Sequence, residues 1–206
     1  MSYCESLQGI CLPSGLQTLE LGGSFNQSLL GIRLPAKLQT LVFGDSFNQS
    51  LKAVQLPPGL KTLTFGRDFN RCLEGVVLPS NLKELTFGDD FNQSLEGVQL
   101  PSNLQTLSFG HSFNQCLEGV CLPTSLLSLQ LGYKFNRSWK SGGLPGGLQA
   151  LTCGFDFYQS LESVQVPENL QSLTFCSEFA PSFEGVALPN VLFKFSCRDI
   201  RVSVHS

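Results

Sequence analysis

Residues 57–78 read PPGLKTLTFGRDFNRCLEGVVL, and this 22-residue unit recurs along the whole 206-residue chain. Three residue types keep the same period. They are Phe25, Phe47, Phe69, Phe91, Phe113, Phe135, Phe157 and Phe179; Pro13, Pro35, Pro57, Pro79, Pro101, Pro123, Pro145, Pro167 and Pro189; and Gly22, Gly44, Gly66, Gly88, Gly110, Gly132 and Gly154. A period shared by three residue types indicates an array of about nine stacked units.

The first part of the unit predicts a short strand. Leu63 and Phe65 alternate with Thr62 and Thr64, which is the period-2 pattern of a half-buried strand. Gly66 then ends the strand and permits an unusual backbone turn.

The second part of the unit predicts the return path of one coil. Phe69 and Leu73 stand four residues apart, which suits one helical or 3₁₀ turn. Val76 and Leu78 indicate a second short extended segment, and Pro79 closes the corner. One coil cannot bury these side chains alone, so we expect a mainly β repeat solenoid whose strands pair in parallel about 4.8 Å apart.

The string LQTLSFGHSFNQ, residues 104–115, resembles FNIP-type repeats, which are leucine-rich-repeat-like. The resemblance implies a partner-binding array, often found beside an F-box, although this chain contains no F-box-like helical segment. The usual ladder position for asparagine holds other residues here. We expect the asparagines two positions later to bond backbone between coils, in a geometry that need not be the familiar horseshoe: Asn26, Asn48, Asn70, Asn92 and Asn114.

The repeat predicts a single solenoid over residues 1–206, with a divergent closing segment over 190–206. In that segment Ile200, Val202 and Val204 alternate, as in a terminal strand. Residues 139–143 depart from the repeat, so we expect a looser coil there. The sequence starts in mid-repeat, which fits a self-capping half-coil or a fragment of a longer F-box-type receptor.

Composition argues against several classes of partner. Thirteen Lys and Arg stand against 16 Asp and Glu, so nothing basic is available to neutralise nucleic-acid phosphates. No apolar run reaches membrane-spanning length, and the first five residues do not resemble a signal peptide.

The cysteines predict a reducing compartment. None of the eight stands at the same repeat position as a cysteine of the next coil, so their spacing disfavours disulfides. We therefore expect reduced thiols that act as small buried hydrophobes in an intracellular, cytoplasmic protein. No Cys-x-x-Cys pair is present to suggest zinc.

Two further patterns have structural interpretations. Glycosylation sequons begin at Asn26, Asn48, Asn92 and Asn136, but without a signal peptide we interpret these asparagines as structural. Glu74, Glu96 and Glu118 share one position in successive coils, which raises a cation site. Lys52 and Lys140 at the same position favour a solvated ladder, so we expect no metal and no cofactor.

The position after the repeated glycine varies, and binding specificity is expected there. It brings His111, Tyr133 and Phe155 into three consecutive coils, which predicts an aromatic ladder with charged neighbours. The ladder is either a partner-binding surface or simple ring stacking. The candidate partner-binding residues are Arg67, Asp89, His111, Tyr133, Lys134, Phe155 and Asp156.

The function that these patterns favour is a non-catalytic protein–protein interaction scaffold. The chain has two histidines and no nucleophile elbow, P-loop or HExxH motif, so we expect no enzyme activity. Columns of outward Thr and Ser on the strands leave open an ice-binding or carbohydrate-binding surface as an alternative. The oligomeric state is not indicated.

Overall fold

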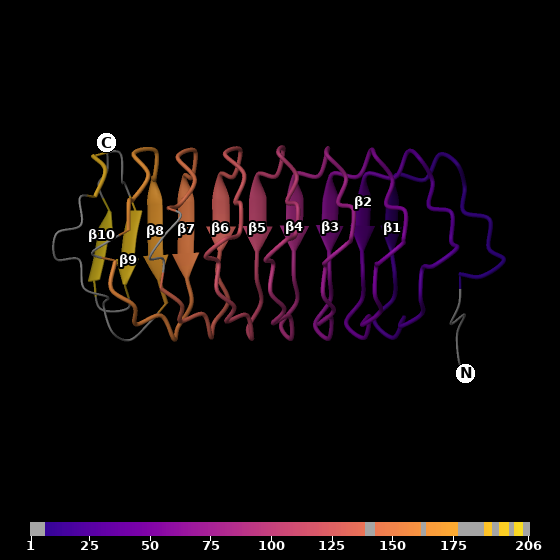
Figure 1. Cartoon of the computed structure of the whole chain (residues 1–206), viewed down its shortest axis with the longest axis horizontal. Coiled ribbons are helices and arrows are strands. Elements are labelled where there is room, and N and C mark those ends of the chain that lie inside the picture. The colour runs from indigo at the N-terminus through magenta and orange to yellow at the C-terminus, as the bar shows by residue number, and fades with distance from the viewer. Residues whose placement is uncertain are drawn as a thin grey trace.

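The described residues form a solenoid whose coils each contribute a strand to one sheet (Figure 1). The structure is a computed structural model that describes residues 7–138, 143–161, 164–176, 188–190, 194–197 and 200–203, and these contain no helix. The strands are β1 (Thr18–Glu20), β2 (Thr40–Val42), β3 (Thr62–Thr64), β4 (Glu84–Thr86), β5 (Thr106–Ser108), β6 (Ser128–Gln130), β7 (Ala150–Cys153), β8 (Ser172–Phe175), β9 (Lys194–Cys197) and β10 (Ile200–Ser203).

The strands form one sheet in chain order. Strands β1 to β9 are parallel, and each residue pairs with the residue 22 positions later, as Leu63 does with Leu85. The last strand, β10, runs antiparallel to β9 and contains Ile200 and Val202 of the predicted terminal strand, whereas Val204 lies outside the described residues. Residues 139–142 of the predicted looser coil lie outside the described residues.

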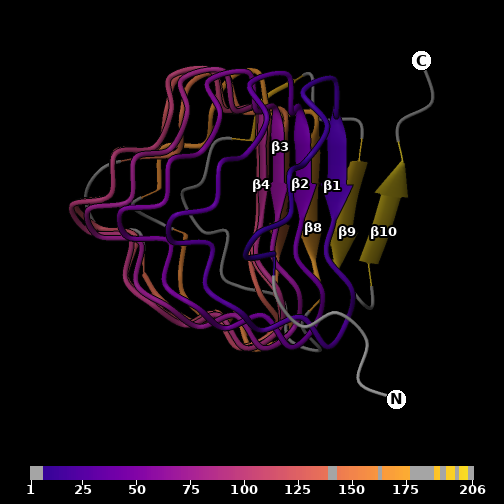
Figure 2. The same ribbon diagram turned by 90° about the vertical axis from the view of Figure 1, so that its right-hand side faces the viewer.

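The sheet lines a concave side of the solenoid. Viewed along the array, β1 and β9 lie further out than β4, so the strand column bows inward at its middle (Figure 2). The return segments lie on the opposite, convex side. We number the coils from the proline that begins each one, so that coil 1 spans residues 13–34 and coil 4 spans residues 79–100.

The repeated glycine brings neighbouring coils into backbone contact. A β-carbon at Gly88 would overlap the carbonyl oxygen of Gly66, and a β-carbon at any other glycine of this position from Gly44 to Gly154 would likewise overlap the glycine carbonyl oxygen of the preceding coil. The unusual backbone turn for which Gly66 was expected to be needed does not involve a positive φ at Gly66, since positive φ angles occur elsewhere in the coil, as at Gly75. Glycine is therefore required for close approach, not for turn conformation.

Two columns of phenylalanine rings fill the interior. The turn column stacks at about one ring per coil, with centroids of Phe69 and Phe91 6.0 Å apart and nearly parallel. The strand column lies against it, and Phe65 is 3.8 Å from Phe69 between centroids. Both rings of that pair are almost fully buried. The excess of phenylalanine in the composition thus follows from two repeated core positions.

An asparagine ladder joins successive coils and confirms the prediction. The side-chain oxygen of Asn70 accepts a hydrogen bond from the backbone N–H of Asn92 at 3.0 Å. The same bond recurs from Asn26 to the N–H of Tyr158 in the seventh coil, at 2.9–3.1 Å. Each ladder asparagine therefore satisfies a backbone donor of the next coil, and the donors from Asn70 to Asn136 are half-buried.

The helical turn expected between Phe69 and Leu73 is wrong. Asn70 donates its backbone N–H to Asn48 of the preceding coil, so that donor is not available to a helical bond within its own coil. The next chain reversal is a turn in which Val76 N–H donates to the Leu73 carbonyl. Beyond it, the second extended segment, Val76 to Leu78, is not a strand of the sheet.

Replacing Gly88 by alanine is expected to destabilise the fold strongly. The added carbon would meet the Gly66 carbonyl oxygen, which belongs to backbone that cannot rotate aside. We expect a loss of about 3 kcal/mol or more, at the upper end of overpacking effects. Denaturant unfolding followed by circular dichroism measures it. Gly22→Ala is the matched control, because a β-carbon there meets nothing within 4 Å. Equal losses for the two variants would contradict the close-approach argument.

Replacing Asn70 by alanine is expected to cost about 1–3 kcal/mol, because it leaves the half-buried N–H of Asn92 without its acceptor. The matched control is Asn103→Ala. Asn103 is exposed and donates to the carbonyl of Ser80 from an outer turn. The free energy of unfolding of both variants should be compared with that of the unchanged protein. A smaller loss for Asn70→Ala than for Asn103→Ala would show that the ladder is not a principal tie between coils.

Candidate functional interface

The variable position after the repeated glycine forms a column along one edge of the concave sheet. A backbone ladder fixes its spacing, since Ser112 N–H donates to the Asp89 carbonyl and Lys134 N–H to the His111 carbonyl. The same bond links Asp156 to Tyr133. Side chains at this position are therefore presented from a rigid backbone, one per coil.

The structure brings His111, Tyr133 and Phe155 together as predicted. The ring centroids of His111 and Tyr133 are 4.7 Å apart at an interplanar angle of 15°. Those of Tyr133 and Phe155 are 4.9 Å apart at 4°. His111 and Tyr133 are exposed, Tyr133 by 43%, and Phe155 is half-buried. We call these three residues the aromatic column.

Towards the N-terminus the same edge is charged. The Arg67 Nε donates to the Asp68 carboxylate at 2.9 Å, and both side chains are well exposed. The hydrogen bond and charge of Asp68 raise the pKa of Arg67, with the charges of Asp45 and Asp90 adding to the effect. Such exposed ion pairs contribute little to stability, so the main effect of these charges is the electrostatic potential that they create at the surface.

Two of the predicted site residues stand one position further along the chain. Lys134 and Asp156 flank the aromatic column, Lys134 exposed and Asp156 half-buried. Within the part of the chain that the structure describes, Arg67 and Asp68 form the one ion pair within 4 Å, so Lys134 and Asp156 are not joined to each other. The predicted set is thus one continuous edge, charged at one end and aromatic at the other.

The outward face of the sheet is polar. Thr62 donates its hydroxyl to the Glu84 carboxylate at 3.3 Å across neighbouring strands. The hydroxyl columns are real, but they line a concave surface (Figure 2). A concave face does not follow a flat ice lattice, so the curvature of the sheet disfavours the ice-binding alternative.

Glutamates at the repeated position project from turns on the return side. The N–H groups of Glu74 and Glu96 donate to Cys72 Sγ and Ser94 Oγ, two residues earlier. Among the described residues no group of three or more His, Cys, Asp or Glu side chains is placed to hold a metal ion. The sequon asparagines all accept inter-coil backbone bonds, as the structural interpretation requires.

The cysteine prediction is partly wrong. Six described cysteines are free thiols, but only Cys153 is buried. Cys72 and Cys116 are exposed because they replace the turn serine and accept its hydrogen bond through sulfur. Burial raises the pKa of Cys153, and the nearby Cys176 thiol raises it further. The serine repeat at this turn is the sequence signal that would have placed Cys72 and Cys116 correctly.

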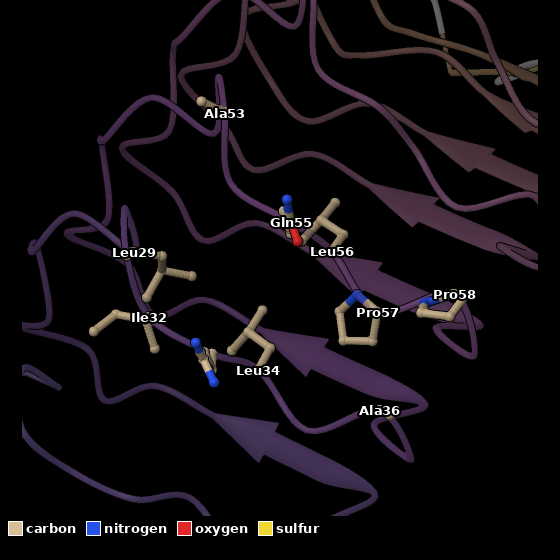
Figure 3. Close-up of a pocket in the computed structure, with 11 residues that line it drawn as sticks. Leu29, Ile32, Leu34, Ala36, Ala53, Gln55, Leu56, Pro57 and Pro58 are labelled. Carbon is tan, nitrogen blue, oxygen red and sulfur yellow. The ribbon is translucent and has the colours of Figure 1, made fainter.

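The sequence did not predict a groove on the convex side. It has a volume of about 600 Å³ and lies between the return segments of coils 1 and 2. Leu29, Ile32, Leu34, Leu56 and Pro57 line it (Figure 3). Its polar side chains are Arg33 and Gln55, so it contains no acid–base pair. The sequence does depart from the repeat at this groove: its lining residue Ala53 stands where other coils have glycine, and it keeps a positive φ of 65°.

Comparison with known proteins identifies the repeat. The pattern of the FNIP Repeat family matches residues 5–46, 47–90 and 91–134, which is more than half of the chain. The chain belongs to the FNIP repeat family. No curated protein is similar enough in sequence to count as a relative of this FNIP repeat chain.

Two solved structures share the fold of the FNIP repeat chain. CroV588, described as a novel circular LRR protein structure, has a TM-score of 0.70 at 37% identity over 88% of this chain and 30% of its own. YopM from Yersinia enterocolitica WA-314 has a TM-score of 0.60 at 26% identity over 91% of this chain and 38% of its own. This chain thus spans about a third of their lengths, and its leucine-rich-repeat-like fold is confirmed. No helix in the described residues is long and apolar enough to cross a membrane.

Thiol labelling tests the cysteine assignments. In the native protein, Cys176 should react with an alkylating reagent at neutral to mildly alkaline pH, whereas Cys153 should not, because it is buried and its raised pKa keeps it protonated. Peptide mass mapping distinguishes the two. Denaturant should make Cys153 reactive as well. Since the unfolded thiol ionises at lower pH than the folded one, this residue favours unfolding as pH rises above the ordinary thiol range. Rapid native labelling of Cys153 would contradict its placement.

Proposed function

We propose that this FNIP repeat chain is a non-catalytic scaffold that binds a protein partner along its concave sheet and the edge that carries the aromatic column. The observation that carries the proposal is the exposed stack of His111, Tyr133 and Phe155. Stacked rings on hydrogen-bonded backbone lose little conformational freedom on binding, which favours affinity. Aromatic side chains of this kind are enriched among residues that dominate interface energy.

The shape and surface of the array support the same proposal. The sheet face is concave and polar, with Thr62 and Thr86 half-buried on it. Extended concave surfaces are what stacked-repeat proteins use to bind partners. The described residues offer no clustered nucleophile and base, so catalysis has no support from the side chains. The exposed free thiols Cys72 and Cys116 suit a reducing, intracellular compartment.

A partner-capture experiment tests the proposal. The tagged chain and the triple variant His111→Ser, Tyr133→Ser, Phe155→Ser are used as baits, and captured proteins are quantified by mass spectrometry. We expect at least one partner whose recovery with the triple variant falls about tenfold or more, because hot-spot residues contribute about 2 kcal/mol or more each.

The control is a variant on the convex side. Leu30 and Val77 are 60% and 80% exposed there, so Leu30→Ser with Val77→Ser removes comparable apolar surface without touching the edge. This variant should retain the partner. Circular dichroism must show that both variants fold. Unchanged capture by a folded triple variant would overturn the proposal.

A further inference from the structure

The aromatic column ends abruptly at His111. One face of its ring stacks on Tyr133, and no other ring contacts it within the described residues. The preceding coil has Asp89 at the same position, whose side chain is too short to continue the stack. Asp89 instead accepts the backbone N–H of His111 through Oδ1 at 3.3 Å. The outward face of the His111 ring is therefore bordered by a carboxylate.

The surroundings of that face are strongly acidic. Asp45, Asp68, Asp89 and Asp90 lie on this edge in the three coils before His111, and its cations are Arg67 and Lys134, so four carboxylates against two cations leave two negative charges. Arg67 is already bound to Asp68. Asp89 and Asp90 are both exposed and belong to the coil directly before that of His111. The field at the end of the stack thus favours a cation and repels phosphates.

We propose that an arginine side chain of the partner stacks on the outward face of His111 and is held by the carboxylates of Asp89 and Asp90. This inference rests on the proposed function and specifies the chemistry of the partner at one point. A guanidinium is planar, stacks on aromatic faces and forms bidentate bonds with carboxylates. It would continue the column at the 4.7–4.9 Å spacing that the rings already have.

The chain contains an internal precedent for this arrangement. Arg67 stands at the same repeat position one coil before Asp89, and its guanidinium is held by the carboxylate that follows it in sequence. Its charge is stabilised further by Asp45 and Asp90. A guanidinium from outside would use Asp90, the equivalent of Asp68 one coil on, together with Asp89 and the ring of His111. Lysine meets the charge but not the planar stacking, so arginine is preferred.

Nuclear magnetic resonance can detect this contact directly, because the chain has only two histidines, His111 and His205. The probe is an acetylated, amidated Gly-Arg-Gly peptide, titrated into the full chain while histidine ring signals are followed. We expect saturable changes in the chemical shifts of the His111 ring signals, at millimolar peptide, and none at His205. The Gly-Lys-Gly peptide should bind about threefold or more weakly, and the neutral Gly-citrulline-Gly peptide should not shift His111.

Paired variants locate the carboxylates. Asp89→Asn with Asp90→Asn keeps an acceptor for the His111 N–H and removes two charges, and it should weaken Gly-Arg-Gly binding about fivefold or more, as for the loss of exposed ion pairs. Glu74→Gln with Glu96→Gln, which removes two exposed charges from turns on the return side, is the matched control and should bind as the unchanged chain does. Equal shifts with arginine and citrulline, no shift at His111, or full binding by the double variant would each overturn the arginine site.

The two proposals can fail separately. If the partner is lost with the triple serine variant but Gly-Arg-Gly leaves His111 unaffected, the interaction surface stands and the arginine site is wrong. If Gly-Arg-Gly binds as described while partner capture is unchanged by the triple variant, the arginine site stands and the proposed interaction surface is wrong.

Discussion

The structure depends on how closely one coil can approach the next. At the turn after each strand, the glycine of one coil sits directly over the glycine carbonyl of the coil before it, with no room for a side-chain carbon. This contact keeps the coils at sheet spacing beyond the end of the three-residue strands. The asparagine ladder, the phenylalanine columns and the aromatic column all require that spacing, because each links a residue to its equivalent one coil away.

The same contact explains where the regular stack changes. Cys176 occupies the glycine position in coil 8, and its N–H donates to the Cys153 carbonyl at 3.2 Å. Strands β7 and β8 are four residues long there, against three in the coils before them. A side chain at the close-contact position is thus accompanied by longer strand pairing. Further on, β10 turns back antiparallel along β9, which ends the parallel order.

Much of this structure could be predicted from the sequence, because a repeat of fixed length determines which residues of successive coils are neighbours. A fixed period states which residues lie over one another, so the strands, the phenylalanine core, the asparagine ladder and the stack of His111 with Tyr133 followed from counting. The path within one coil did not. The spacing of Phe69 and Leu73 fits a helical turn equally well, and only the inter-coil bond of Asn70 decides against it. The prediction that Cys72 is buried was also wrong. Cysteine is typically buried, but Cys72 stands where other coils have a turn serine, and its thiol is exposed there.

The close glycine contact also determines how such a gene can change length. Each of coils 1 to 7 presents the next with the same glycine surface, so such a coil can be duplicated or lost as a unit and the two sides still fit. An insertion of any other length would move the repeated glycine, phenylalanine and asparagine of the later coils out of alignment with those of the earlier coils. The exception is an insertion that bulges from a turn. Gain or loss of one whole coil between Arg67 and His111 would change the distance between the charged residues and the aromatic column by one strand spacing. Recognition in this architecture can therefore be altered in discrete steps while the core of each coil stays the same.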